Sequence, residues 1–146
     1  MATTKISSQD IRIYTMDKAE LNTLLRGVRW SSEEIDSAIV MTISYYNESP
    51  PLIDSYSAET FPYRYALLMG VTGYLLKSAA INEASNNLTY NIDGVTVNDK
   101  DKSDIFLRMG QQYWEEYKGM VQNFKVTKNI GAAFGGVSSE LQRMAR

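Results

Sequence analysis

The Asp93-Gly94 dipeptide is the feature that most constrains the fold of this 146-residue chain. Asp-Gly favours the type I′ turn of a two-residue β-hairpin loop, and apolar residues alternate with polar ones on both sides of it. The period of two places one set of side chains on the same face: Leu88, Tyr90, Ile92, Val95 and Val97. Because an isolated hairpin is marginally stable in water, we expect Tyr90, Ile92, Val95 and Val97 to contact another surface.

Long helical patterns flank this hairpin. Apolar residues recur at helical spacing over residues 62–86, where Gly70 and Gly73 suggest that another backbone approaches closely, most simply a helix of the same subunit. A second pattern ends near Thr127 or Lys128. Its apolar and small residues follow a heptad-like spacing that favours packing against the preceding helices: Phe106, Gly110, Tyr113, Tyr117, Met120 and Phe124.

Two shorter helices are expected in the N-terminal half. Thr15 is a suitable N-cap for a helix over Met16–Arg26, which Gly27 would end. Ser31 and Glu34 form a capping box that opens a second helix, and Pro50 and Pro51 follow its end. The alternation around Ile11 and Ile13 indicates a short extended segment.

The C-terminal stretch differs from the rest, because residues 131–136 contain three glycines and few large side chains. We therefore expect a mainly α fold, a four-helix bundle-like domain with one β-hairpin inserted between the last two long helices and an extended C-terminal arm. The expected divisions are an N-terminal arm over 1–14, a helical domain over 15–128 with its hairpin at 88–97, and a C-terminal arm over 129–146.

Composition argues against most enzyme classes. The chain has no His and no Cys, which removes the commonest general base, thiolate metal sites and disulfides. The Asp99-x-Asp101-x-Ser103 run resembles the start of a calcium loop, but Asp104 and Gly110 stand where an EF-hand needs Gly and Glu. No phosphate-binding or nucleophile motif is present. The sequence predicts no catalytic residue, no cofactor and no metal.

The formal net charge of -2 excludes a protein that coats DNA through a large basic excess. A small helix-turn-helix regulator using residues 16–46, whose DNA binding would be lost on substituting Arg26 or Arg29, is an alternative from a different class. Against it, residues 31–47 contain three carboxylates and no Lys or Arg. No apolar run is long enough to span a bilayer, and no signal peptide is evident, so we expect the protein in the cytoplasm or in an assembly built there.

The order of two capped helices, a long helix, an Asp-Gly hairpin, a long helix and a Gly-containing arm resembles the small head–tail connector proteins (adaptor or neck proteins) of tailed bacteriophages. The resemblance covers roughly residues 15–137. The segments that carry it are Phe61–Leu68, Tyr90–Val97 and Asn129–Gly136. None of them is a diagnostic motif, so the resemblance lies in architecture.

The resemblance implies a virion protein of the neck, assembled in the host cytoplasm. Its partners would be the portal protein, a tail or neck protein and further copies of itself in a ring, usually of twelve, that extends the channel for packaged DNA. A terminal segment commonly binds the portal in this family. Here that segment would be residues 126–146, with contacts from Val126, Ile130, Phe134, Val137 and Leu141. Another virion component, in tail completion or the baseplate, is the alternative within the same class.

The same resemblance implies that carboxylates face the channel, where they would let DNA slide without sticking. The candidates are Glu33, Glu34, Asp36 and Asp54, and the sequence does not choose among them. The charge is also divided along the chain, with a net of -4 over residues 1–60 and +2 over 61–146. Unlike surfaces of neighbouring copies could pair through such a division.

Overall fold

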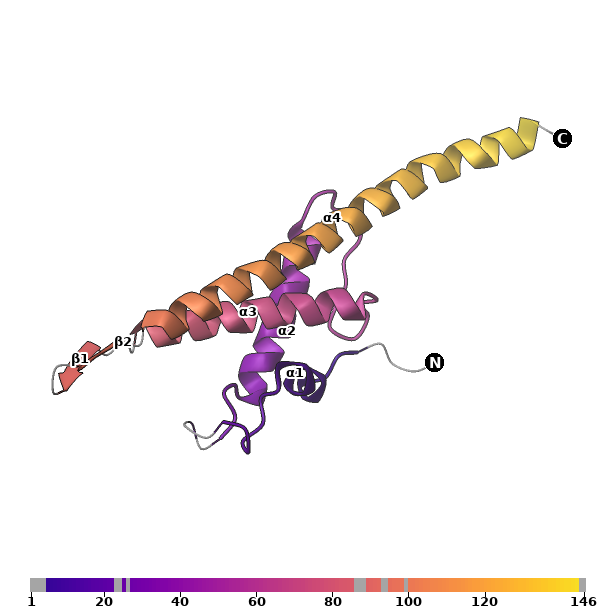
Figure 1. The fold of residues 1–146 in the computed structure, drawn as a ribbon. Coiled ribbons are helices and arrows are strands. Elements are labelled where there is room, and N and C mark those ends of the chain that lie inside the picture. The colour runs from indigo at the N-terminus through magenta and orange to yellow at the C-terminus, as the bar shows by residue number, and fades with distance from the viewer. Residues whose placement is uncertain are drawn as a thin grey trace.

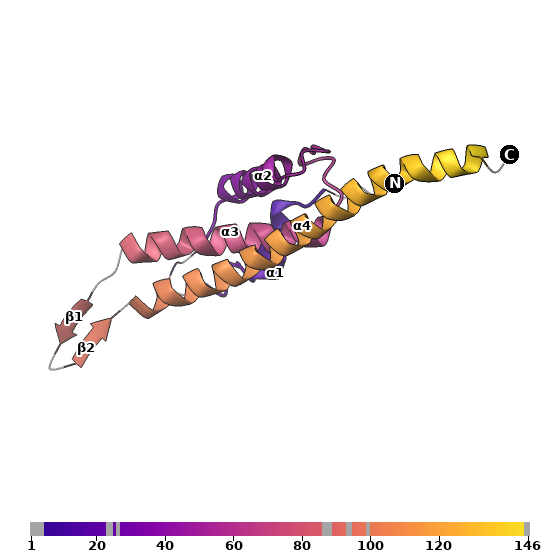
Figure 2. The same cartoon turned by 90° about the horizontal axis from the view of Figure 1, so that it is seen from above.

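The computed structural model describes residues 5–22, 25, 27–85, 89–92, 95–98 and 100–144, with side chains described over 5–22, 25, 27–85 and 102–132. Its elements follow in the order α1 (Ser8–Thr15), α2 (Ser32–Glu48), α3 (Arg64–Ser85), β1 (Thr89–Ile92), β2 (Val95–Asn98) and α4 (Lys100–Met144). α3 and α4 lie antiparallel, α2 crosses α3 steeply, and α1 lies beside α2 and α3 (Figure 1). From above, α4 continues well past the other helices (Figure 2).

Two glycines let α3 and α4 approach closely. A Cβ at Gly73 would lie 2.8 Å from the backbone nitrogen of Trp114 and 3.0 Å from the carbonyl oxygen of Gly110. A Cβ at Gly110 would lie 2.9 Å from the backbone nitrogen of Lys77. The predicted close approach at Gly73 is confirmed, and the backbone that approaches belongs to the same subunit. Gly70 serves a related purpose, since a Cβ there would lie 2.8 Å from the ring of Tyr117.

The predicted capping box of α2 is also confirmed. The Ser31 hydroxyl accepts from the Glu34 backbone N–H at 3.1 Å, and the Glu34 carboxylate accepts from the Ser31 N–H at 2.8 Å. The buried side of α2 then meets α3 and α4, where the Tyr117 hydroxyl donates to the Thr42 carbonyl oxygen at 2.6 Å. The largest apolar core residues are Tyr46, Tyr117, Phe61, Ile11, Ile35, Leu67, Met69, Leu75, Val71 and Val121.

The prediction for the N-terminus is wrong. Residues 8–15 form α1 instead of an extended segment, and no helix occupies the described positions between Met16 and Gly27. A capping box of Ser7 and Asp10 opens α1, and Met16, with φ of 57°, ends it in the left-handed conformation. Ile11 is buried in the core, so this segment belongs to the packed body and is not an arm.

Asp17 explains why residues 16–30 leave the helical path. Its buried carboxylate accepts from the backbone N–H of Arg29 at 2.6 Å and of Trp30 at 3.1 Å, and it pairs with Arg12 at 3.0 Å. Asn22 donates a fourth hydrogen bond to it at 2.7 Å. An aspartate that satisfies distant backbone donors in this way competes with the local helix that the sequence pattern suggests.

Between α3 and α4 the chain forms two short antiparallel strands, with Tyr90 opposite Val97 and Ile92 opposite Val95. The Asp93-Gly94 turn and Leu88 lie outside the described residues, as do the side chains of both strands. The predicted turn type and the predicted contacts of the hairpin face therefore fall outside what the structure describes. After the hairpin, α4 begins at Lys100, and the Ser103 hydroxyl donates to the Ala80 carbonyl oxygen on α3.

The predicted fold class is wrong in its overall form, although the chain is mainly helical. The helices do not make a four-helix bundle, because only α3 and α4 run alongside each other and α1 has eight residues. The extended C-terminal arm is also wrong, because residues 129–144 continue α4. Each interior glycine costs about 1 kcal/mol of helix propensity, but residues 129–144 contain no proline and extend a helix that is already nucleated.

Candidate interaction surface

The C-terminal half of α4 leaves the body of the protein near Lys128. Val121 and Lys125 are buried, whereas Val126 is 45% exposed and Ile130 is 48% exposed. Beyond Lys128 the described side chains, residues 129–132, are all exposed. The helix therefore changes from a core element to a projection within about one turn.

An apolar stripe begins at this point of departure. Val126 and Ile130 are one turn apart, and residues 134, 137 and 141 follow at spacings of 4, 3 and 4 on the same helix. With 3.6 residues per turn, these spacings place all five positions on one side of α4. The stripe consists of Val126, Ile130, Phe134, Val137 and Leu141, which are the candidate portal-binding residues that the resemblance to connector proteins implies.

The structure describes only the first two of these side chains. Val126 and Ile130 are exposed large hydrophobic residues, as a docking surface requires. Phe134, Val137 and Leu141 are in α4, but their side chains lie outside the described part of the chain. The hairpin residues Tyr90, Ile92, Val95 and Val97 are paired as given above, with their side chains also outside it.

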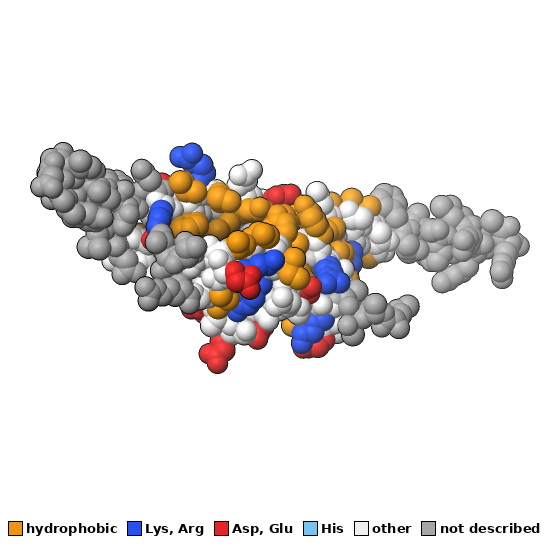
Figure 3. All heavy atoms as spheres, turned by 60° about the horizontal axis from the view of Figure 1, so that its bottom comes forward, with side chains coloured by type: hydrophobic (Ala, Val, Ile, Leu, Met, Phe, Trp, Pro, Cys, Tyr) orange, Lys and Arg blue, Asp and Glu red, His pale blue; other side chains and the backbone are white. Residues whose placement is uncertain are grey.

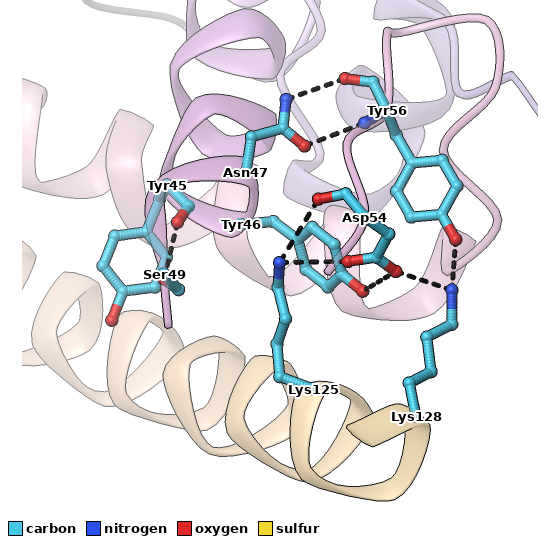
Figure 4. Close-up of polar contacts among 8 residues, drawn as sticks. All are labelled: Tyr45, Tyr46, Asn47, Ser49, Asp54, Tyr56, Lys125 and Lys128. Carbon is cyan, nitrogen blue, oxygen red and sulfur yellow. Dashed lines mark hydrogen bonds and ion pairs between the residues drawn. The ribbon is translucent and has the colours of Figure 1, made fainter. Parts of the chain in front are cut away.

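An aspartate on the loop between α2 and α3 fixes the base of the projection. Asp54 pairs with Lys125 at 3.0 Å and with Lys128 at 2.6 Å, so both ends of the last buried turn of α4 are held (Figure 4). The Tyr46 hydroxyl donates to the same carboxylate at 2.9 Å, and the Lys128 ammonium also contacts the Tyr56 hydroxyl. We call Asp54, Lys125, Lys128, Tyr46 and Tyr56 the Asp54 cluster.

The cluster holds one of its charges, the Lys125 ammonium, away from solvent. The Lys125 side chain is fully buried, and its ammonium lies 4.2 Å from the centre of the Tyr46 ring, within cation–π range. The loop itself is held by Asn47, whose side-chain amide makes two hydrogen bonds of 2.8 Å to the backbone of Tyr56 (Figure 4). A buried ammonium needs a close counter-ion, and Asp54 provides it.

These contacts shift the pKa values of Asp54, Lys128 and Tyr46. Burial acts to raise the pKa of Asp54, but hydrogen bonds from Lys128, Lys125 and Tyr46 outweigh it and hold that pKa well below its usual range. The hydrogen bond to Asp54 raises the pKa of Lys128, and burial together with the Asp54 hydrogen bond raises that of Tyr46. At neutral pH Asp54 is therefore a carboxylate paired with ammonium groups, and it is not a free acid for a channel wall.

The other predicted acidic residues, Glu33, Glu34 and Asp36, are exposed on α2. Within the described residues no three His, Cys, Asp or Glu side chains come together as a metal site would require. Over the same part of the chain, none of the helices has both the length and the apolar character needed to cross a lipid bilayer.

The helix-turn-helix alternative requires a first helix at residues 16–26, but the described residues 16–22 are not helical. Arg29, one of the two arginines on which its DNA binding would depend, pairs with Glu83 at 3.5 Å and lies over the Phe106 ring at 4.9 Å. The other, Arg26, lies outside the described residues.

Sequence reasoning missed the Asp54 cluster and the helical state of residues 129–144. Asp54 and Lys125 are 71 positions apart, and no local pattern links them. The helical spacing of the stripe was present in the sequence and could have predicted the longer α4. Comparison of the chain with protein-family models, with curated proteins and with solved structures finds no match.

Proposed function

We propose that this protein is a structural component of a phage neck that docks onto a larger protein through the projecting half of α4. The observation that carries the proposal is the apolar stripe that begins at Val126, where the helix leaves the body. An amphipathic helix that presents one apolar side is a recurrent mode of docking into a groove on a partner.

The assignment to a head–tail connector rests on the resemblance in element order. In this proposal the portal protein receives the stripe, and a ring of copies, usually twelve in the family, extends the DNA channel. A tail or neck protein binds the opposite side. The stripe spans five positions of one helix, which is a modest length for a docking segment. Ring multiplicity would convert many weak contacts into a firm attachment.

Electron microscopy of the phage particle that contains this chain tests the proposal directly. We expect a ring of the protein at the junction between head and tail, with α4 directed toward the portal. A position at the baseplate or the tail tip would support the alternative virion component. Absence of the protein from purified particles would contradict both.

A pair of variants tests the role of the stripe. Val126→Lys with Ile130→Lys places two charges on it, and we expect loss of the protein from assembled particles with an unchanged circular dichroism spectrum. Asn129→Lys is the matched control, since Asn129 is exposed on the same turn of α4 but lies off the stripe. Equal incorporation of the double variant and the control would overturn docking through the stripe.

A further inference from the structure

The body carries a second uncovered apolar surface, distinct from the stripe on α4. It consists of Ile13, Tyr14 and Met16 from the end of α1, with Tyr65 on α3 and Met109 on α4, and we call it the α1 patch. These side chains are between 40% and 62% exposed. Two grooves make up the α1 patch, one of about 500 Å³ beside Ile13 and Tyr65 and one of about 270 Å³ beside Met16 and Met109. Tyr14 lines both grooves and so connects them.

The α1 patch is held in a defined shape. The Tyr14 hydroxyl donates to the Tyr113 hydroxyl at 3.1 Å, and this hydrogen bond raises the pKa of Tyr14 to about 12. The two rings meet edge to face, with centroids 6.2 Å apart. Figure 3, which turns the α1 side forward, shows apolar side chains gathered in a band across this face.

A different uncovered apolar surface lies on the outward side of α2. Val40 is 55% exposed and Met41 is 50% exposed. Exposed carboxylates flank these two residues along the helix, with Glu33 and Asp36 on the N-terminal side and Glu48 on the C-terminal side. We call these five residues the α2 face. The whole of α2, Ser32–Glu48, contains no Lys or Arg.

The two surfaces point in opposite directions from α3. Tyr65 lines the groove next to Ile13, whereas Tyr74 lines a groove of about 420 Å³ next to Met41. Tyr65 and Tyr74 are nine residues apart, about two and a half helical turns, so they stand on opposite sides of α3. A two-fold contact of either surface with itself would leave the other uncovered.

We infer that the α1 patch of one copy packs against the α2 face of the next copy. This inference deepens the proposed function by naming the faces through which the ring would form. A contact between two different surfaces of identical chains repeats from copy to copy and closes into a ring when the rotation permits. It covers both apolar surfaces at once.

Charge favours the same pairing. The α2 face is acidic at both ends, and exposed cations lie beside the α1 patch: Arg64, whose side chain is 54% exposed although it pairs with Asp10, and Lys18. Carboxylates on one copy and cations on the next are complementary, whereas two α2 faces would repel each other.

The size of the surfaces indicates how strong the contact is. With roughly 200 Å² for each large side chain, the five residues of the α1 patch expose on the order of 500 Å². A partner that covers them gives a total near 1,000 Å², the lower end of specific interfaces. We therefore expect weak association of the free protein, which a covalent trap can detect.

Engineered cysteines provide that trap, since the chain has no Cys of its own. Ile13→Cys and Val40→Cys place thiols at two positions that are both 55% exposed, one on each surface. After mild oxidation with a copper–phenanthroline catalyst, we expect an equimolar mixture of the two variants to form two-chain species. The double variant should form a ladder of longer species.

The control is Leu52→Cys, at a position 73% exposed and outside both surfaces. The mixture of Ile13→Cys with Val40→Cys should cross-link several-fold more than the mixture of Ile13→Cys with Leu52→Cys. Tyr65→Cys with Met41→Cys repeats the test for a shifted register, and circular dichroism confirms that the variants are folded.

Two results would overturn the inference. Cross-linking of Ile13→Cys or Val40→Cys alone, at the level of their mixture, would show a two-fold contact. Cross-linking of both mixtures at the control level would show that the surfaces do not meet. In either case, continued incorporation of the wild-type protein into a neck ring would leave the proposed function in place.

Discussion

At the scale of single residues, Asp54 links a loop to a helix that is remote in sequence. Its carboxylate serves a fully buried Lys125 and a partly exposed Lys128 at once. Removing one partner of a buried ion pair is costly because the other charge stays buried without compensation. Asp54 is therefore the residue whose loss should affect the body most without changing any apolar contact.

Replacing Asp54 with Asn should destabilise the protein by about 3 kcal/mol, because the Lys125 ammonium would lose its counter-ion. Urea denaturation followed by circular dichroism measures the free energy of unfolding. The control is Glu115→Gln, which breaks the exposed pair with Lys118 at 3.0 Å and should leave stability unchanged. An Asp54→Asn variant as stable as this control would show that the cluster contributes little.

The low pKa of Asp54 predicts a pH dependence. An aspartate in an unfolded chain has a pKa of about 3.9. The pKa of Asp54 in the folded protein is lower, so the folded state binds the proton less readily than the unfolded state. The contribution of Asp54 to stability is then complete above about pH 4 and is lost as the pH falls through the folded pKa. As the pH falls from about 4 to about 2, unfolding measurements should show a steeper loss of stability for the wild type than for Asp54→Asn. Parallel curves would contradict the assignment.

At the scale of elements, the pairing of α3 with α4 depends on the small residues at their crossing. Gly73 and Gly110 face each other's backbone, and neither leaves space for a methyl group. The free energy gained from this close packing exceeds the helix propensity that is lost by having glycine at both positions. A glycine elsewhere in the same helix need not have this role.

Gly73→Ala and Gly119→Ala form a matched pair that tests this point. A Cβ at Gly119 meets nothing within 4 Å, so that substitution should stabilise α4 by up to about 1 kcal/mol. Gly73→Ala should instead destabilise the protein by roughly 1–3 kcal/mol, because the backbone of Trp114 must move. Thermal and urea denaturation measure both. Stabilisation by both substitutions would mean that the helices separate readily.

At the scale of the whole molecule, the body of the protein and the projecting end of α4 have separate roles, stability for the first and docking for the second. The core is complete by Lys125, and the last described contact between α4 and the loop is made by Lys128. Stability should therefore depend on the chain up to Lys128, and docking on the chain beyond it.

Two truncations separate these roles. Ending the chain after Lys128 should leave the unfolding temperature nearly unchanged and abolish attachment to the particle. Ending it after Phe124 also removes Lys125 and Lys128, so it should lower the unfolding temperature clearly. A large loss of stability in the longer truncation would show that residues 129–146 support the body.

The sequence by itself determined the features that depend on neighbouring residues. The Ser31 and Glu34 capping box, the helical state of α2 and α3 and the small-residue approach at Gly73 are local patterns with local causes. The capping box of Ser7 and Asp10 is also a local pattern, but it was not predicted. The resemblance to connector proteins supplied the candidate portal-binding residues, which lie on a helix that was expected to end near Lys128.

Only the tertiary structure decided the rest, because its causes are contacts between distant residues. Asp17 reaches the backbone of Arg29 and Trp30 and removes the helix expected over Met16–Arg26. Asp54 reaches Lys125 and Lys128 across more than 70 positions and fixes where α4 leaves the body. A side chain that satisfies a distant donor or charge has the same local sequence as one that is solvated, so its role appears only when the chain is folded.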